Sequence, residues 1–125
     1  MVAKNLTAIV PTEEYQDLVK SHRDDMMSTW GGLDILVNNA GVLDALTPLV
    51  EVDDALWARV MRVNVEAPFR AMRAVIPGML ERGGGVILNT CSAAALAGGR
   101  AGAAYTTSKH ALLGLTRSTA WQYGN

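Results

Sequence analysis

Apolar positions along the chain change their period, and these changes divide it into alternating strands and helices. Residues 33–37 and 86–88 are short, branched and almost wholly apolar, which is typical of strands buried on both faces of a parallel sheet. Residues 53–82 and 105–123 instead repeat apolar residues in steps of three and four, as helices do. This alternation predicts strands and helices that follow one another in a parallel sheet with right-handed crossovers.

The first 30 residues extend the same alternation towards the N-terminus. Residues 7–10 have the pattern of a strand end, and residues 15–30 carry a helical apolar pattern. Thr12 suits the N-cap of that helix, and Gly31-Gly32 suits its C-terminal end. The predicted order is therefore β-α-β-α-β-α, an α/β fold with a Rossmann-like parallel sheet flanked by helices and only the central portion of that fold present.

The long helix at residues 53–82 has recognisable boundaries. Asp53-Asp54 can cap its start, Gly83-Gly84-Gly85 ends it, and Pro68 predicts a kink within it. The predicted buried stripe consists of Leu56, Val60, Val63, Ala67, Ala71 and Ala74. The last helix is expected to present Ala111, Leu112, Leu115 and Ala120 as its apolar positions.

Composition and charge narrow the class of protein. The 125 residues suffice for one domain, and half of them are apolar while 18% are charged, as in a globular protein. A net charge of −1 argues against nucleic-acid binding, and no apolar run reaches the roughly 20 residues of a membrane span. No signal peptide is recognisable, and the single cysteine, Cys91, fits a reducing compartment, so we expect a cytoplasmic protein.

Polar and small residues follow both central strands, where ligands bind in open parallel sheets. Asn38-Asn39-Ala40-Gly41 follows the first of them and would allow a ligand close to the backbone. The same residues would also suit a simple turn that closes the strand. Ser92 lies at the end of the second strand, and its hydroxyl could serve chemistry or bond to nearby backbone.

Two further features sit on the helices. Tyr105 and Lys109 are four residues apart and so share one helix face, where an ammonium would favour the ionised phenol and let it exchange protons. By spacing alone the pair could equally be a surface contact. Asn64 interrupts an apolar stretch of helix, and it needs a partner if buried or solvent if not.

In combination, these residues resemble the short-chain dehydrogenase/reductase family. The resemblance rests on the run from Leu33 to Gly41, then Asn64 between two valines, then Ser92, then Tyr105-Thr106-Thr107-Ser108-Lys109. Ser92 and Tyr105 are separated by 13 residues, the spacing usual in that family. The resemblance extends from about Gly31 to the end of the chain.

The resemblance implies an NAD(P)-dependent oxidoreductase that transfers hydride between nicotinamide and an alcohol or ketone. It implies that Tyr105 is the general acid and base, that Lys109 assists it and binds the nicotinamide ribose, and that Ser92 holds the substrate oxygen. It implies that Asn64, at a local distortion of its helix, keeps a water in a proton relay. The implied cofactor contacts are Asn38, Asn39, Ala40, Gly41, Tyr105 and Lys109.

The resemblance also implies partners: a small-molecule alcohol or ketone, and a second copy of the chain in a homodimer or homotetramer built on the two long helices. No metal site, nucleic acid or membrane is expected. His22 and His110 are interpreted as helix-surface residues, and Cys91 as a packing residue.

The chain departs from that family in length. It carries little more than one of the two βαβαβ halves, and no strand is followed by a glycine-rich turn and a helix. We therefore expect one partial Rossmann-fold domain over residues 1–125. It could be a piece of a larger enzyme, a short protein that lacks the cofactor cradle, or a chain whose site is completed by neighbours. The alternative function is a non-catalytic assembly module.

Overall fold

The computed structural model describes residues 31–124, together with residues 17, 20, 21, 24, 25, 28 and 29, which are helical. The predicted strand at residues 7–10 and the predicted N-cap at Thr12 lie outside the described residues. Within the described part, no helix is both long enough and apolar enough to cross a membrane.

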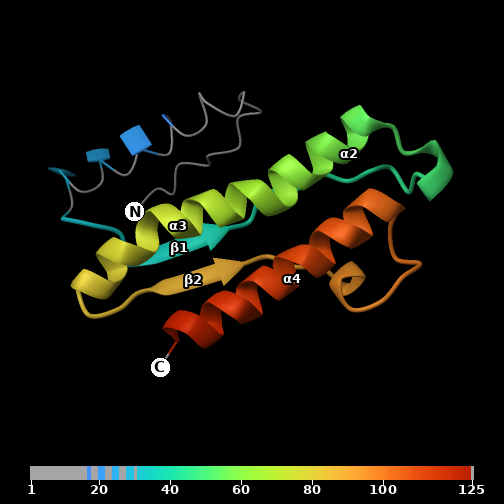
Figure 1. Cartoon of the computed structure of the whole chain (residues 1–125). Coiled ribbons are helices and arrows are strands. Elements are labelled where there is room, and N and C mark those ends of the chain that lie inside the picture. The colour runs from blue at the N-terminus through green and yellow to red at the C-terminus, as the bar shows by residue number, and fades with distance from the viewer. Residues whose placement is uncertain (1–16, 18–19, 22–23, 26–27, 30, 125) are drawn as a thin grey trace.

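Within the described residues, the sheet consists of two parallel strands. β1 (Ile35–Asn38) and β2 (Val86–Asn89) pair in register, so that Asn38 lies opposite Asn89 at the carboxyl ends of both (Figure 1). The crossover between parallel strands requires a long connection, and here it is helical. The predicted fold class, a Rossmann-like parallel sheet flanked by helices, is confirmed.

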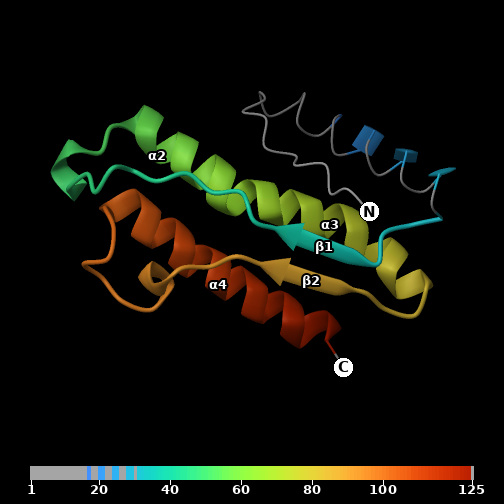
Figure 2. The same cartoon turned by 180° about the vertical axis from the view of Figure 1, so that it is seen from behind.

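The two strands are less buried than their sequences predict. Ile35, Val37, Val86 and Leu88 are each more than half exposed. Both long helices lie on one side of the sheet, and Figure 2 shows the strands from the side without them. The prediction of strands buried on both faces is therefore wrong for the described residues, because only one face of this sheet is covered by described helices.

The crossover predicted as one helix over residues 53–82 has three parts. α2 (Asp54–Met61) is capped by the Asp53 carboxylate, which accepts from the Leu56 amide at 2.7 Å. A π-helical turn, η2 (Arg62–Glu66), follows and leads directly into α3 (Ala67–Glu81). Pro68 has no amide hydrogen to donate to the Asn64 carbonyl, so the regular helical bond cannot form there.

The π-helical turn also changes which residues are buried. The buried side chains of this crossover are Val60, Asn64, Pro68, Ala71, Met72, Val75 and Met79. Of the predicted stripe only Val60 and Ala71 are fully buried, because the wider turn rotates the residues after it relative to a regular helix. The stripe was predicted with one regular period and is wrong for this reason, whereas the local distortion expected at Asn64 is present as the π-helical turn.

α4 (Ala103–Tyr123) completes the described fold and packs against α2, η2 and the short 3₁₀ turn η3 (Ala93–Ala95). It begins two residues earlier than predicted. Leu112 is buried as expected, whereas Ala111 and Leu115 are half-buried and Ala120 is exposed. The core lies between the helices and one sheet face. The carboxyl ends of both strands point towards the start of α4 (Figure 1).

Candidate active site

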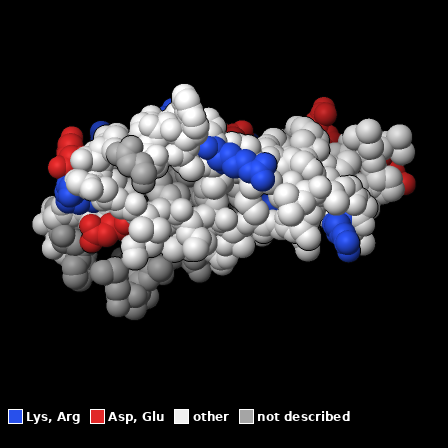
Figure 3. All heavy atoms as spheres, turned by 90° about the horizontal axis from the view of Figure 1, so that it is seen from below, with Lys and Arg blue, Asp and Glu red and all other residues white. Residues whose placement is uncertain are grey.

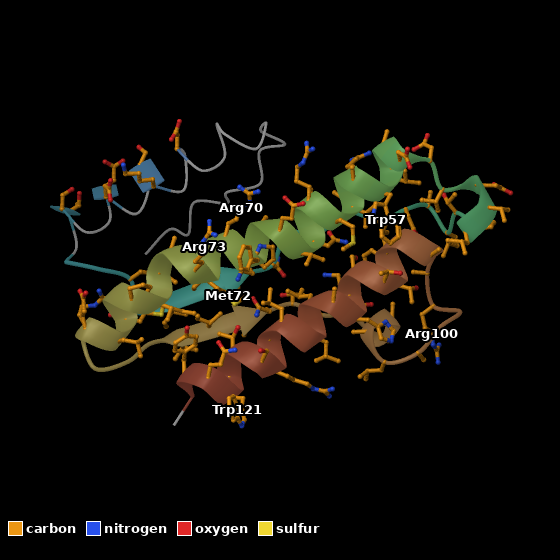
Figure 4. All side chains as sticks on the ribbon, in the orientation of Figure 1. Trp57, Arg70, Met72, Arg73, Arg100 and Trp121 are labelled. Atoms are coloured by element: carbon orange, nitrogen blue, oxygen red, sulfur yellow. The ribbon has the colours of Figure 1, made fainter. Side chains whose placement is uncertain are left out.

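A chain of side-chain hydrogen bonds joins the two strand ends to the helices. The Asn38 amide donates to the Asn89 side-chain oxygen at 2.7 Å, and the Asn89 amide donates to the Thr116 hydroxyl at 2.9 Å. Asn89 also contacts the sulfur of Met72, which Figure 4 shows on the inner side of α3. The Asn38 side chain thus ties the sheet to its helices, while its backbone carbonyl accepts from the Thr90 amide.

The other three residues of the predicted cofactor segment form an exposed loop. Asn39, Ala40 and Gly41 are all exposed, and the Asn39 side-chain oxygen accepts from the Thr90 hydroxyl at 2.9 Å. A Cβ on Gly41 would lie 3.4 Å from the Asn64 side-chain oxygen and 3.5 Å from Lys109 Nζ. The side of Gly41 that lacks a side chain therefore lies against two of the predicted catalytic residues.

Lys109 is a buried ammonium at the centre of the site. Lys109 is 3% exposed, and its Nζ donates to the Thr90 carbonyl at 2.9 Å. Burial lowers the pKa of Lys109 from its ordinary value of 10.5, and the nearby Cys91 sulfur acts in the opposite direction. A buried amine with a perturbed pKa in a polar cluster is typical of a functional site.

Tyr105 lies one turn before Lys109 on α4, as the sequence spacing predicts. The Lys109 Nζ lies 5.6 Å from the centre of the Tyr105 ring. This places the positive charge of Lys109 beside the Tyr105 ring, in a cation–π contact.

Asn64 is fully buried within the π-helical turn, so the interpretation in which it reaches solvent is wrong. Its side-chain oxygen accepts from the Val42 amide at 2.9 Å, and its amide donates to the Val42 carbonyl at 3.0 Å. The same amide also donates to the Ser108 hydroxyl at 2.9 Å. One side chain thus fixes the loop after Gly41 and the start of α4 relative to the crossover helix.

Ser92 sits at the start of η3, at the end of the connection from β2. Its hydroxyl oxygen accepts from the Ala94 amide at 3.2 Å and so caps this turn. The local backbone bond considered from the sequence is therefore present. The structure brings Asn64, Lys109 and Tyr105 together through α4, and it places Ser92 on the segment that packs against α4.

Two buried polar residues of the site were missed by the sequence reasoning. Ser108 is fully buried and shares one helix face with Ala104 and Leu112, a four-residue spacing that could have indicated its burial. Asp44 is 1% exposed, and its carboxylate accepts from the backbone amides of Gly102 and Tyr105. No local pattern indicates this contact, because it joins residues about sixty positions apart.

Fold and site together define an α/β protein whose polar cluster lies at the carboxyl ends of parallel strands, where this class binds ligands. The family model for short chain dehydrogenases matches residues 6–125 of the chain. The chain belongs to the short-chain dehydrogenase family.

Curated relatives agree with this membership. The chain is 44% identical to 3beta-hydroxysteroid dehydrogenase 2 of Eggerthella lenta over 120 residues, which is 87% of this chain and 46% of the relative. It is also 44% identical to the short chain dehydrogenase/reductase dpchG of Colletotrichum higginsianum, over 96% of this chain and 46% of that protein. The chain spans about half the length of the curated relatives it matches.

Solved structures show the same fold. A metagenomic short-chain oxidoreductase in complex with NADP superposes with a TM-score of 0.79 at 36% identity, covering 86% of this chain and 48% of that one. A gluconate 5-dehydrogenase from Burkholderia cenocepacia J2315, in complex with NADP and tartrate, gives a TM-score of 0.80 at 32% identity, covering 86% and 42%.

Proposed function

We propose that residues 1–125 form one partial Rossmann-fold domain that carries the proton-transfer half of an NAD(P)-dependent oxidoreductase. The substrate class is an alcohol or its ketone. The observation that carries this proposal is the buried ammonium of Lys109, which lies beside both the Tyr105 ring and Gly41. The names of the relatives range from hydroxysteroid to gluconate, which supports no narrower substrate.

The described residues suit the nicotinamide end of such a cofactor. Lys109 has three ammonium hydrogens and donates one to the Thr90 carbonyl, so it has donors for a ribose hydroxyl. Asn39, Ala40 and Gly41 form an exposed loop that a ligand can reach, and Gly41 lies against Lys109 and Asn64. Over residues 31–124 neither strand leads through a glycine-rich turn directly into a helix, so we assign no pyrophosphate contact there.

When bound, NAD(P) would supply or accept the hydride at the carbon of the substrate. Tyr105 would donate its phenolic proton to the carbonyl oxygen during reduction and take it back during oxidation. The Ser92 hydroxyl would orient that oxygen, which requires it to turn from its bond with the Ala94 amide. Asn64 and Lys109 would return the proton to Tyr105 through water, and Pro68 leaves the Asn64 carbonyl without its regular helical donor.

Binding of NADH and NADPH to the purified chain, followed by fluorescence with the intact mass recorded on the same sample, tests the proposal. Saturable binding in the micromolar range by a sample of the expected mass would support a cofactor site completed by a partner subunit. Absence of binding by the natural polypeptide that contains these residues would contradict the proposal. The comparison of the two cofactors would also decide between NAD and NADP.

Lys109→Met is expected to separate function from stability. Loss of a charge-assisted hydrogen bond, about 1.5–3 kcal/mol, predicts cofactor binding weaker by roughly 10–100-fold. The free energy of unfolding at neutral pH should stay the same or increase. Burial lowers the Lys109 pKa, which means that the buried charge destabilises the folded chain, and Met removes that charge.

The sign of this stability effect can be checked against pH. The unfolded chain retains the Lys109 proton up to about 10.5, whereas the folded chain releases it earlier. The advantage of Lys109→Met should therefore be largest at neutral pH and shrink as the pH approaches 10.5. Urea unfolding of both proteins at several pH values measures it, and an advantage over the wild type that grows from neutral pH towards 10.5 would contradict this assignment.

The second candidate function is a non-catalytic assembly module. A surface through which such a module assembles would also serve a homodimer or homotetramer of an enzyme. The α4 side of the molecule, seen in Figure 3, carries few charged side chains. Trp121 is 87% exposed and points away from the sheet at the end of α4 (Figure 4). Exposed aromatic residues on a weakly charged face favour protein contacts.

Trp121→Glu is expected to weaken self-association by about 2 kcal/mol or more, because aromatic anchors dominate interfaces. Sedimentation velocity over a concentration series measures this. Val50→Glu is the matched control, since Val50 is 92% exposed but lies in the 3₁₀ turn η1 (Leu49–Glu51), on another element. Self-association without NAD(P) binding would favour the assembly module. An unchanged oligomer in Trp121→Glu would show that the α4 side is not the interface.

A further inference from the structure

A buried carboxylate lies against the start of the helix that carries Tyr105. Asp44 follows the Gly41 loop and is 1% exposed. One of its oxygens accepts from the Gly102 amide at 3.1 Å, and the other accepts from the Tyr105 amide at 2.8 Å. The proposed roles of the other residues do not use this carboxylate.

The first turn of α4 depends on this distant loop for its caps. The residue at its N-cap position, Gly102, has no side chain and provides no cap of its own. The Asp44 carboxylate and the Thr47 backbone carbonyl cap the helix instead. The Thr47 carbonyl accepts from the Ala103 amide at 3.3 Å. A negative charge at a helix N-terminus also interacts favourably with the helix dipole.

Gly102 leaves the space that the carboxylate fills. A Cβ at this position would lie 2.5–2.6 Å from the carboxylate atoms of Asp44, so a side chain there would displace them. The loop after Asp44 is also held in an uncommon conformation, because Ala45 and Leu46 both have positive φ angles, 53° and 63°. Non-glycine residues adopt this region where the surrounding structure imposes it.

Tyr105 is fixed from its other side as well. Its backbone carbonyl accepts from the Ser108 hydroxyl at 2.7 Å, and that hydroxyl accepts from the Asn64 amide. The amide of Tyr105 is thus bonded directly to Asp44 in the loop after β1, and its carbonyl is bonded to Ser108 on α4 itself. The π-helical turn reaches Tyr105 indirectly, through the bond from Asn64 to the Ser108 hydroxyl.

We propose that Asp44 is a positioning residue for Tyr105, acting through the backbone amides of Gly102 and Tyr105. This inference rests on the proposed function and deepens it. A proton donor must lie within hydrogen-bonding reach of the atom it protonates. Without the carboxylate, the first turn of α4 would loosen, and a displacement of about 1 Å at a catalytic group can reduce turnover about 10²-fold.

The test compares Asp44→Ala and Asp44→Asn with Asp53→Ala in the natural polypeptide that contains these residues. Asp53 caps α2 through the Leu56 amide, so its variant loses the same kind of bond away from Tyr105. We expect kcat to fall about 10²-fold in Asp44→Ala and KM to change little, because positioning acts in the transition state. Asp44→Asn keeps one good acceptor and should restore part of the rate.

Asp53→Ala should lose thermal stability as Asp44→Ala does but keep its kcat. Equal kcat values for Asp44→Ala and Asp53→Ala would overturn the proposal. If Asp44→Ala does not fold, Asp44→Asn decides alone, and a wild-type kcat in that variant would overturn it.

A readout independent of turnover separates this inference from the proposed function. Hydrogen exchange at the Tyr105 amide should be faster in Asp44→Asn, and the ring resonances of Tyr105 should shift. Unchanged exchange and ring signals would overturn the positioning role. Failure of the proposed function would instead show as turnover that survives Tyr105→Phe, whatever Asp44 does.

Discussion

Replacing Tyr105 with Phe is expected to reduce turnover by about 10²–10⁴-fold, the usual contribution of a general acid or base. The substitution removes one oxygen atom and keeps the ring against which the Lys109 ammonium lies at 5.6 Å. Cofactor binding should change little, because Lys109 and the Gly41 loop remain. Steady-state kinetics with NADH and NADPH, together with a thermal melt, measure both effects.

Tyr123→Phe is the matched control for this experiment. Tyr123 lies on the same helix, is 49% exposed, and is separated from Tyr105 by the length of α4. Both variants should keep their stability to within about 0.5 kcal/mol, as is usual for surface and half-buried changes that remove no buried partner. Near-normal turnover in Tyr105→Phe would refute the proposed mechanism.

The elements of the fold follow from local patterns, and this is why they could be predicted. The strand expected at residues 33–37 is observed as Ile35–Asn38, and the second, expected at residues 86–88, as Val86–Asn89. Gly83 and Gly84 end α3 as expected, with φ angles of 92° and 135° that suit glycine. Exposure of the outer sheet face could not be predicted, because it depends on which faces the rest of the fold covers.

The site was predictable only where its geometry follows helix spacing. Tyr105 and Lys109 meet because they are one turn apart, and Asn64 was noticeable because it is a poor helix former among apolar residues. Its actual partners, Val42 and Ser108, come from other segments, and so does the Asp44 contact. Contacts between distant segments leave no periodic signal in a single sequence.

Asn38 shows a related limit of sequence-based prediction, because a residue assigned to a ligand can have a partner within the protein. Its position after a strand predicted a cofactor contact, but its side chain donates to Asn89 across the sheet. The polar residues that end two paired parallel strands lie side by side, so they can satisfy each other as well as a ligand. Only the pairing of the two strands shows that the Asn38 side chain bonds to Asn89. This bond supports a positioning role for the Asn38 side chain, in addition to its proposed role in cofactor binding.

Asn64→Leu is expected to produce the largest loss of stability, about 2–4 kcal/mol. Leu has the same branched arrangement of side-chain heavy atoms, but it is bulkier and cannot bond the amide and the carbonyl of Val42, which lie beside a fully buried position. It also removes the donor to the Ser108 hydroxyl. Since the total stability of a domain is about 5–15 kcal/mol, urea unfolding should show a large fall in the midpoint.

Asn39→Ala provides the control for stability alone, because Asn39 is exposed and its side chain bonds to the exposed Thr90 hydroxyl. It should change the free energy of unfolding by no more than about 0.5 kcal/mol. In the fraction of Asn64→Leu that stays folded, turnover should also fall, since the Gly41 loop and the start of α4 lose their common anchor. A stable Asn64→Leu variant with full activity would show that the buried amide fixes neither the Gly41 loop nor the start of α4. It would also show that the link from the π-helical turn to Tyr105 does not position Tyr105.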